Sequence, residues 1–412
     1  MQTGQKPIGM FMTIFQNKKN VLIWCGIVAF FILFFVSMFA GTKALSFKDA
    51  MYVMKSEFSG GKSSQQSTQS AQSAENSSLS ATSSDTSSHS SSGTSSDSPS
   101  GTSSHSPSDT SSYEPTLGDA AQKISLAGAK AILFKIRLPR TLSCILCGAA
   151  LSVSGLILQL ALNNVLASPG IIGVNSGSGF FVLLASLLFP YASFVRSIAA
   201  FFGAVISVLF VYFISEKSGL SKTTLILAGV AVSSLMSAGI DVLITLHPEI
   251  VSDKVAFSLG GFQNVSFQSL KISSFVIILC IVSLFFMASG IELFQLGDET
   301  AYSLGLNVRF YRILSIMLSG ILAGSAVSVC GLLGFVGLLI PNFIRMIRLP
   351  KSTVKANIFL CIIFGADFLL LCDILARVLF FPYEVPVGLF LSCLGSPFFI
   401  WMLITKKRNL RL

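Results

Sequence analysis

The sequence carries little charge, since only 11% of its residues are Asp, Glu, Lys or Arg while 52% are hydrophobic. Soluble globular domains have roughly 25% charged residues, so most of this chain is expected to be solvated by lipid. Histidine is scarce too, and the apolar stretches contain no series of carboxylates or histidines that would mark a proton or ion path. No constellation of nucleophile, base and acid is present. The chain is therefore predicted not to be an enzyme by itself, and energy for any transport would come from a partner.

Cysteine is present, but not in a metal-binding arrangement. All eight cysteines lie in apolar stretches. Cys144 and Cys147 form a CxxC pair, yet no second pair lies near them and none of the histidines is close. A structural zinc ion requires four ligands. We predict no metal site and interpret the cysteines as small residues of membrane-buried helices.

Long apolar runs make up most of the chain. Stretches of about 18 or more apolar residues are long enough to cross the hydrocarbon core. Backbone groups inside lipid must be paired within the segment, which favours helices. The predicted fold class is all-α, a polytopic membrane protein with about ten transmembrane helices. The candidate stretches are residues 22–40, 141–162, 171–190, 195–215, 222–245, 271–289, 312–330, 331–345, 356–377 and 386–405.

The first apolar run is open to a second interpretation as a signal peptide. Its core, VLIWCGIVAFFILFFVSMFA, is longer than the apolar core of about 7–15 residues that signal peptides use. We therefore predict a retained first transmembrane helix at residues 21–41.

Basic residues cluster at the ends of the predicted helices. Positive charge marks cytoplasmic loops, and with ten spans all of these clusters fall on one side of the membrane. This predicts a multi-pass protein of the cell membrane with both termini in the cytoplasm, residues 1–20 included. The same clusters account for the net charge of +10 without a nucleic-acid partner. They are Lys18 and Lys19; Lys217 and Lys222; Arg309 and Arg312; Arg345, Arg348, Lys351 and Lys355; and Lys406, Lys407, Arg408 and Arg411.

Residues 42–130 form the predicted extracellular loop after the first span, and about half of residues 59–112 are serine. A segment with so few large apolar side chains cannot bury enough surface to offset its chain entropy. Residues 59–115 are therefore predicted to be a disordered external tether. The GGKSS at 60–64 is similar to part of a phosphate-binding loop, but Ser56 occupies the place of the first glycine. A nucleotide site is not expected here.

Three arginines break the charge pattern. Arg137 and Arg140, in KIRLPR, and Arg377, in DILAR, fall at the external ends of predicted helices. Arginines in such places reach phosphate headgroups through their long side chains, or they receive an acidic partner that docks from outside. The charge pattern leaves both explanations open. Asp373 and Arg377 are four residues apart on one helical face and are expected to pair.

Two segments of the sequence are similar to each other. Residues 148–156 read GAALSVSGL and residues 324–332 read GSAVSVCGL. By the predicted topology the first copy runs inward and the second outward, and inverted repeats are frequent in transporters. The fold is therefore expected to contain two inverted-repeat halves.

A series of further motifs follows in order along the chain. They are RLPRTLSCILCGAALSVSGLILQ (137–159), NNVLASPGIIGVNSGSGF (163–180), LILAGVAVSSL (225–235), FSLGGF (257–262), LGDETAYSLGLNV (296–308), GLLGFVGLLIPNFIR (331–345), DILAR (373–377) and EVPVGLFLSCLGSPFFIWML (384–403). Through these motifs, residues 131–408 resemble the permease subunits of ABC importers for ferric siderophores, haem and cobalamin (FecCD type). Two positions depart from the usual pattern of that family: Val165 stands in place of a proline and Asn342 in place of a histidine.

The resemblance implies an assembly. The permease core at 131–408 would form a homodimer, or a heterodimer with a close paralogue, together with two cytoplasmic ABC ATPases and an extracellular substrate-binding lipoprotein. No cofactor would be bound by this chain, because ATP and magnesium belong to the partner ATPase. The implied cargo is an iron chelate, a ferric siderophore first, with haem or cobalamin as alternatives.

The resemblance also implies roles for particular residues. Arg137, Arg140 and Arg377 would receive carboxylates of the binding protein, which favours docking over headgroup contact. The coupling loop 290–311 would contact the ATPase through short helices that contain Leu296, Gly297, Asp298, Glu299, Ala301, Leu304 and Gly305. The candidates for the translocation path, chosen as small polar residues of span five and its neighbours, are Gln159, Ser233, Ser234 and Ser237.

Two rival classes remain. An ion-coupled secondary transporter would work without an ATPase and would respond to ionophores. A membrane-anchored sensor or adhesin would use the Ser-rich segment as a stalk, but it would not need ten spans.

Overall fold

The computed structural model describes residues 6–39, 132–218, 222–263, 265–347, 353–380 and 383–409. The described residues other than Ile132 belong to one compact unit, Met1–Ala44 with Leu133–Leu412. Within the described ranges the chain is helical and contains no strand, as the fold class predicts. The predicted Ser-rich tether at 59–115 lies outside the described residues.

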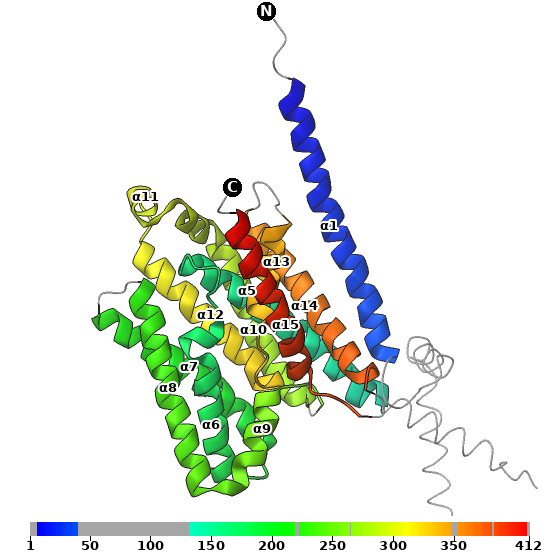
Figure 1. The fold of residues 1–412 in the computed structure, drawn as a ribbon, viewed down its shortest axis with the longest axis vertical. Helices are drawn as coiled ribbons and strands as arrows, with labels where there is room; N and C mark the ends of the chain where they lie inside the picture. Colours follow the sequence, from blue (N-terminus) through cyan, green and yellow to red (C-terminus); the bar gives the residue numbers. More distant parts are fainter. Residues whose placement is uncertain are drawn as a thin grey trace, which may run out of the picture. The chain divides into compact units, whose positions relative to one another are not determined.

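Each of the ten predicted spans coincides with a helix in the described part of the chain (Figure 1). Short helical segments join some of them: η1 (Ile132–Arg137), η2 (Pro169–Ile172), η3 (Pro248–Ile250), α9 (Val251–Leu259), η4 (Phe294–Leu296) and α11 (Asp298–Ser303). The helices at the predicted spans are α1 (Lys6–Phe39), α5 (Leu138–Ala161), α6 (Val174–Leu188), α7 (Ser193–Lys217), α8 (Lys222–Leu246), α10 (Phe267–Leu293), α12 (Val308–Cys330), α13 (Val336–Met346), α14 (Val354–Val378) and α15 (Val387–Asn409).

Seven of the helical segments are long and apolar enough to cross a membrane, and α6, α13 and the apolar part of α15 are shorter. Helix α13 is short because the chain leaves helical geometry between Gly331 and Phe335, directly after α12. Non-helical backbone at membrane depth is tolerated where protein covers it and pairs its polar groups. At this break the amide of Leu332 donates to the carbonyl of Phe257 at 3.0 Å, and the amide of Gly261 donates to the carbonyl of Cys330 at 2.8 Å.

Helix α5 is the central element of the bundle. It contacts α10, α12, α13 and α14, and nearly all of its residues are buried. It runs antiparallel to α12, because Cys147 Sγ lies 3.7 Å from the carbonyl of Ala326 while Ser154 Oγ donates to the carbonyl of Ser319 at 2.7 Å. The two similar segments therefore lie on adjacent helices of opposite direction, as the inverted-repeat prediction requires.

Two glycines of α5 allow its backbone to come into direct contact with the backbones of α13 and α14. A Cβ added at Gly155 would overlap the backbone of Gly337 in α13, and one added at Gly148 would overlap the backbone of Gly365 in α14. Association of helices in lipid depends on van der Waals packing, which small residues at the contact make possible. These two contacts fix how closely α13 and α14 flank α5.

The substitution Gly155→Ala is expected to lower the free energy of unfolding by about 1–3 kcal/mol, because the added methyl group forces α5 and α13 apart. Thermal unfolding of the purified full chain in detergent, followed by loss of the monodisperse size-exclusion peak, measures this. Gly334→Ala is the matched control, since a Cβ at Gly334 meets no atom within 4 Å. Equal midpoints for the two variants would contradict the packing argument.

Candidate functional sites at the two ends of α5

The three arginines predicted to dock a partner lie together at the N-terminal end of α5. Arg137 ends η1, Arg140 lies in the first turn of α5, and Arg377 lies in the last turn of α14. Their exposed fractions are 5%, 6% and 3%. The structure therefore brings the predicted residues into one cluster, but it buries them, and their docking role stays a prediction.

Arg140 is paired with two carboxylates of its own chain. Its Nε and Nη2 donate to Oδ1 of Asp373 at 3.0 and 2.9 Å, and its Nη1 donates to Oε2 of Glu384 at 2.9 Å. The Asp373 side chain is fully buried, whereas that of Glu384 is 26% exposed. Buried charge is tolerated only when it is paired and hydrogen-bonded, so both carboxylates are part of what allows Arg140 to lie here.

Arg377 and Arg137 tie α1 to this cluster. The predicted pair of Arg377 with Asp373 is confirmed, with Nη2 2.6 Å from Oδ2, and the same nitrogen donates to Ser37 Oγ at 2.9 Å. Arg137 Nη1 donates to the carbonyl of Met38 at 2.7 Å. Sequence reasoning missed the α1 residues, because about a hundred positions separate them from Arg137 and no local pattern links the two.

At the other end of α5, the predicted coupling segment forms two short helical elements, η4 and α11. Gly297 and Gly305 bound α11 with φ of 98° and 83°, a backbone region that glycine adopts without strain. Asp298 and Glu299 lie in its first turn, where negative charge is favourable. The structure therefore has short helices in the predicted segment, but the loop is narrower than the predicted 290–311, because α10 continues to Leu293 and α12 begins at Val308.

The predicted coupling segment has one side chain buried in the protein and three large apolar side chains exposed. Ala301 is fully buried, whereas Leu296, Tyr302 and Leu304 are 58%, 76% and 61% exposed. Tyr302 lies in α11, whereas Leu296 and Leu304 flank it. Large apolar side chains that are exposed together are typical of a surface that contacts another protein.

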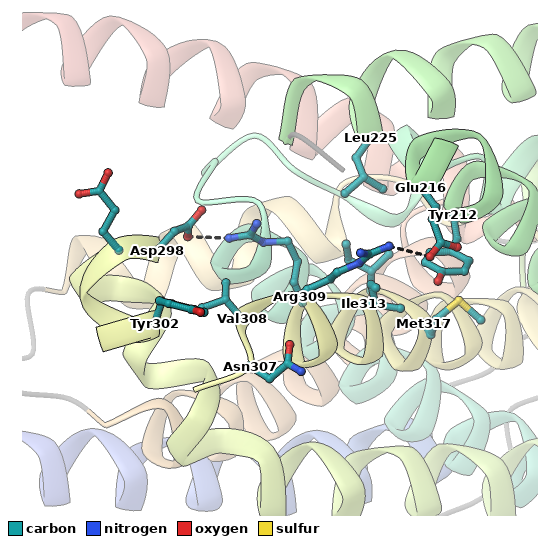
Figure 2. Close-up of a pocket in the computed structure, with 13 residues that line it drawn as sticks. Tyr212, Glu216, Leu225, Asp298, Tyr302, Asn307, Val308, Arg309, Ile313 and Met317 are labelled. Carbon is teal, nitrogen blue, oxygen red and sulfur yellow. Dashed lines mark hydrogen bonds and ion pairs between the residues drawn. The ribbon is translucent and has the colours of Figure 1, made fainter. Parts of the chain in front are cut away.

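Arg312 connects α11 to the end of α5. Its Nη2 donates to Oδ1 of Asp298 at 2.6 Å and its Nε donates to the carbonyl of Ala161 at 3.2 Å. One turn earlier in α12, Arg309 Nη2 donates to Oε1 of Glu216 in α7 at 2.7 Å. Both ion pairs lie beside a cavity of about 570 Å³, and Figure 2 shows Asp298, Arg309 and Glu216 among the residues that line it. Sequence reasoning assigned Arg309 and Arg312 to topology alone and missed this bridging role.

The candidate residues for the translocation path fall into two places. Ser233, Ser234 and Ser237 line one groove of about 550 Å³ on α8, together with Asp241 and the backbone around Ile171. Gln159 is 2% exposed in α5, and its Nε2 lies 3.4 Å from the carbonyl of Gly337. The serines therefore share a surface, and Gln159 lies apart from it in the core.

The two departures from the family pattern contact each other. Asn342 Nδ2 donates to the carbonyl of Val165 at 3.1 Å and to that of Leu338 at 2.8 Å. The amide thereby holds α13 against the loop between α5 and η2. Among the described residues, no group of three or more His, Cys, Asp or Glu side chains is placed to hold a metal ion.

Comparison with known proteins identifies this architecture. The sequence profile of the FecCD transport family matches residues 108–405. The chain belongs to the FecCD transport family. It is 37% identical over 281 residues to the Fe(3+)-citrate import system permease protein YfmD of Bacillus subtilis, with 68% of this chain and 83% of the relative covered. It is 36% identical to the hemin transport system permease protein HmuU of Yersinia pestis, with 68% and 84% covered.

A further relative and a solved structure agree with this assignment. The vitamin B12 import system permease protein BtuC of Klebsiella pneumoniae is 33% identical, with 68% of this chain and 85% of the relative covered. A solved structure described as an inward-facing conformation of a metal-chelate type ABC transporter has 30% identity and a TM-score of 0.63, covering 68% of this chain and 89% of that one. This FecCD protein is thus a multi-pass permease subunit of an ABC importer, a class that works with ATPase and binding-protein partners.

Arg312→Gln is expected to reduce transport per ATP hydrolysed by about tenfold, because it removes the contact through which α11 is linked to α5, and one contact can carry coupling of that size. The measurement is the ratio of uptake to ATP hydrolysis in proteoliposomes that contain the complete importer. Arg309→Gln is the matched control, since it removes an ion pair from the same helix end without detaching α11. A similar loss in both variants, or a lower thermal midpoint for Arg312→Gln alone, would argue for a purely structural role.

Proposed function

We propose that this FecCD protein imports an iron chelate. A ferric siderophore is the favoured cargo, and haem and cobalamin are the alternatives. The match of residues 108–405 to the family, together with relatives named for iron-citrate, hemin and vitamin B12 import, is the observation that carries the proposal. The groove on α8 supports it, because its three serines lie among small or apolar residues and one carboxylate, a mixed lining that suits a large cargo with polar and apolar parts. The other lining residues are Gly170, Ile171, Val230, Ala238 and Asp241. Specificity among chelates would then belong to the binding protein.

The partners proposed for the two ends of α5 differ in chemistry. At the α11 end, the exposed Leu296, Tyr302 and Leu304 suit an apolar groove on each of two cytoplasmic ABC ATPases, which would hold the ATP and magnesium. At the arginine end, guanidinium groups suit carboxylates of an extracellular binding lipoprotein, since arginine pairs with carboxylates through short, charge-assisted bonds. Two copies of the chain, or one copy and a close paralogue, would enclose the path between them.

The proposed cycle follows from these contacts. The loaded binding protein docks on the arginine end, ATP closes the two ATPases, and their motion is applied to α11. Arg312 passes it to α5 and α12, and the helices of the dimer rock between outward- and inward-open states. Ser233, Ser234 and Ser237 would line the route, and both chain termini would lie in the cytoplasm.

One observation favours an ion-coupled transporter as a second candidate. Asp367 in α14 is 7% exposed, and neither oxygen of its carboxylate has a hydrogen-bond partner among the described residues. Ionisable groups inside a membrane often mark ion pathways. Uptake in the presence of an ionophore separates the two candidates: an ATP-driven importer continues to transport, and an ion-coupled one stops.

Affinity purification of the tagged full chain from its native membrane, followed by mass spectrometry, tests the proposed assembly. We expect an ABC ATPase and an extracellular lipoprotein to be recovered with it. Recovery of the chain alone, active in vesicles without ATP, would overturn the importer proposal.

Arg140→Gln is expected to reduce ATP-driven uptake of iron chelates by about tenfold or more, because a binding-protein carboxylate loses its charged partner. Uptake of radioactive iron as citrate, hydroxamate and catecholate chelates measures this and identifies the cargo. Lys135→Gln is the control, since Lys135 is an exposed cation in the same segment. Equal uptake by the two variants, with equal amounts of protein inserted in the membrane, would count against docking at Arg140.

A further inference from the structure

The arginine cluster is already occupied by carboxylates of its own chain. Asp373 accepts hydrogen bonds from Nε and Nη2 of Arg140, and Glu384 accepts one from Nη1. These bonds use three of the five N–H donors of the guanidinium, which is itself buried. An external carboxylate that accepts the Nη1 hydrogen bond now made to Glu384 must displace that side chain.

The two internal carboxylates differ in their ability to leave. Asp373 is fully buried in α14 and lies between Arg140 and Arg377. Its removal would strand two buried charges, which is strongly unfavourable. Glu384 lies on the non-helical stretch before α15, its side chain is 26% exposed, and it faces the Nη1 edge of Arg140.

We propose that Glu384 is an exchangeable internal ligand that holds Arg140 until a carboxylate of the extracellular binding protein replaces it. This inference rests on the proposed docking function and names the residue that regulates it. On docking, the hydrogen bond from Nη1 of Arg140 to Glu384 breaks, the Glu384 carboxylate turns to water, and an incoming carboxylate accepts the same hydrogen bond. Asp373 keeps its two hydrogen bonds throughout.

Exchange of one carboxylate for another costs less free energy than leaving Nη1 of Arg140 without an acceptor. Without Glu384, Nη1 of Arg140 would lose its carboxylate acceptor at 6% exposure, and part of the desolvation cost of the charge would be uncompensated even though Asp373 stays in place. With Glu384 in place, one charge-assisted bond is traded for another, and Arg140 is paired before, during and after docking. The net strength of docking is then a difference between two similar interactions, which suits a partner that must be released in every transport cycle.

Glu384→Gln is the direct test, because the amide keeps the size of the side chain and removes its charge. The affinity of the binding lipoprotein that copurifies with the importer is measured against the full chain in lipid nanodiscs at fixed salt concentration. We expect the dissociation constant to fall about fivefold, the factor that corresponds to a partly exposed ion pair. Glu249→Gln is the matched control, since Glu249 is an exposed carboxylate on the same predicted side that pairs with His247 instead of an arginine.

Arg140→Gln separates failure of this inference from failure of the docking proposal. Loss of binding in Arg140→Gln, with unchanged or weaker binding in Glu384→Gln, would overturn the exchange and leave docking intact. Unchanged binding in Arg140→Gln would remove docking at Arg140 and the exchange with it.

A second probe keeps the inference testable if Glu384→Gln is poorly folded. Fluorescein-labelled hexaglutamate is titrated into nanodiscs at low salt, and its anisotropy is compared for the wild-type chain and Glu384→Asp, whose shorter side chain weakens the bond to Arg140. Tighter binding by Glu384→Asp supports the exchange. Equal or weaker binding, with a wild-type thermal midpoint, would overturn it.

Discussion

The absence of water inside a bilayer is the constraint on which the rest of this structure depends, because every backbone and charged group there must find its partner within the protein. The constraint accounts for membrane-spanning segments that are helices in the described part of the chain. It also accounts for the break after α12, where Leu332 and Cys330 pair with the backbone around Phe257 and Gly261. The arginine cluster obeys the same requirement, since each of its guanidinium groups is met by a carboxylate, hydroxyl or carbonyl.

Helix α5 runs from the arginine cluster to the contact between Arg312 and Ala161. Its 24 residues correspond to a rod of about 36 Å at 1.5 Å per residue. Arg140 lies at one end of this rod and the carbonyl of Ala161, held by Arg312, lies at the other. Glycine contacts hold α5 in direct backbone contact with α13 and α14. In the proposed cycle, a displacement of α11 would therefore move these three helices together.

The charged residues at both ends of α5 pair within the chain, and they adjoin the surfaces proposed for the partners. Asp298 begins a short helix and also anchors it to Arg312, and Asp373 neutralises two arginines while linking α5 to α14. The surface proposed for the ATPase consists of the exposed Leu296, Tyr302 and Leu304 beside the pair of Asp298 with Arg312. At the other end, the partly exposed Glu384 covers the Nη1 group of Arg140 that the binding protein would use. A partner would therefore act on the internal pairs through groups that are accessible.

The sequence by itself determined the ten apolar segments and the pair of Asp373 with Arg377, since each depends on spacing along one stretch of chain. It also carried the family, through motifs that occur in order. Only the tertiary structure decided that α6 and α13 are short, that Asn342 holds the carbonyl of Val165, and that Ser37 and Met38 close the arginine cluster. These features join residues far apart in sequence, and such contacts arise from helix packing, which no local pattern of residues encodes.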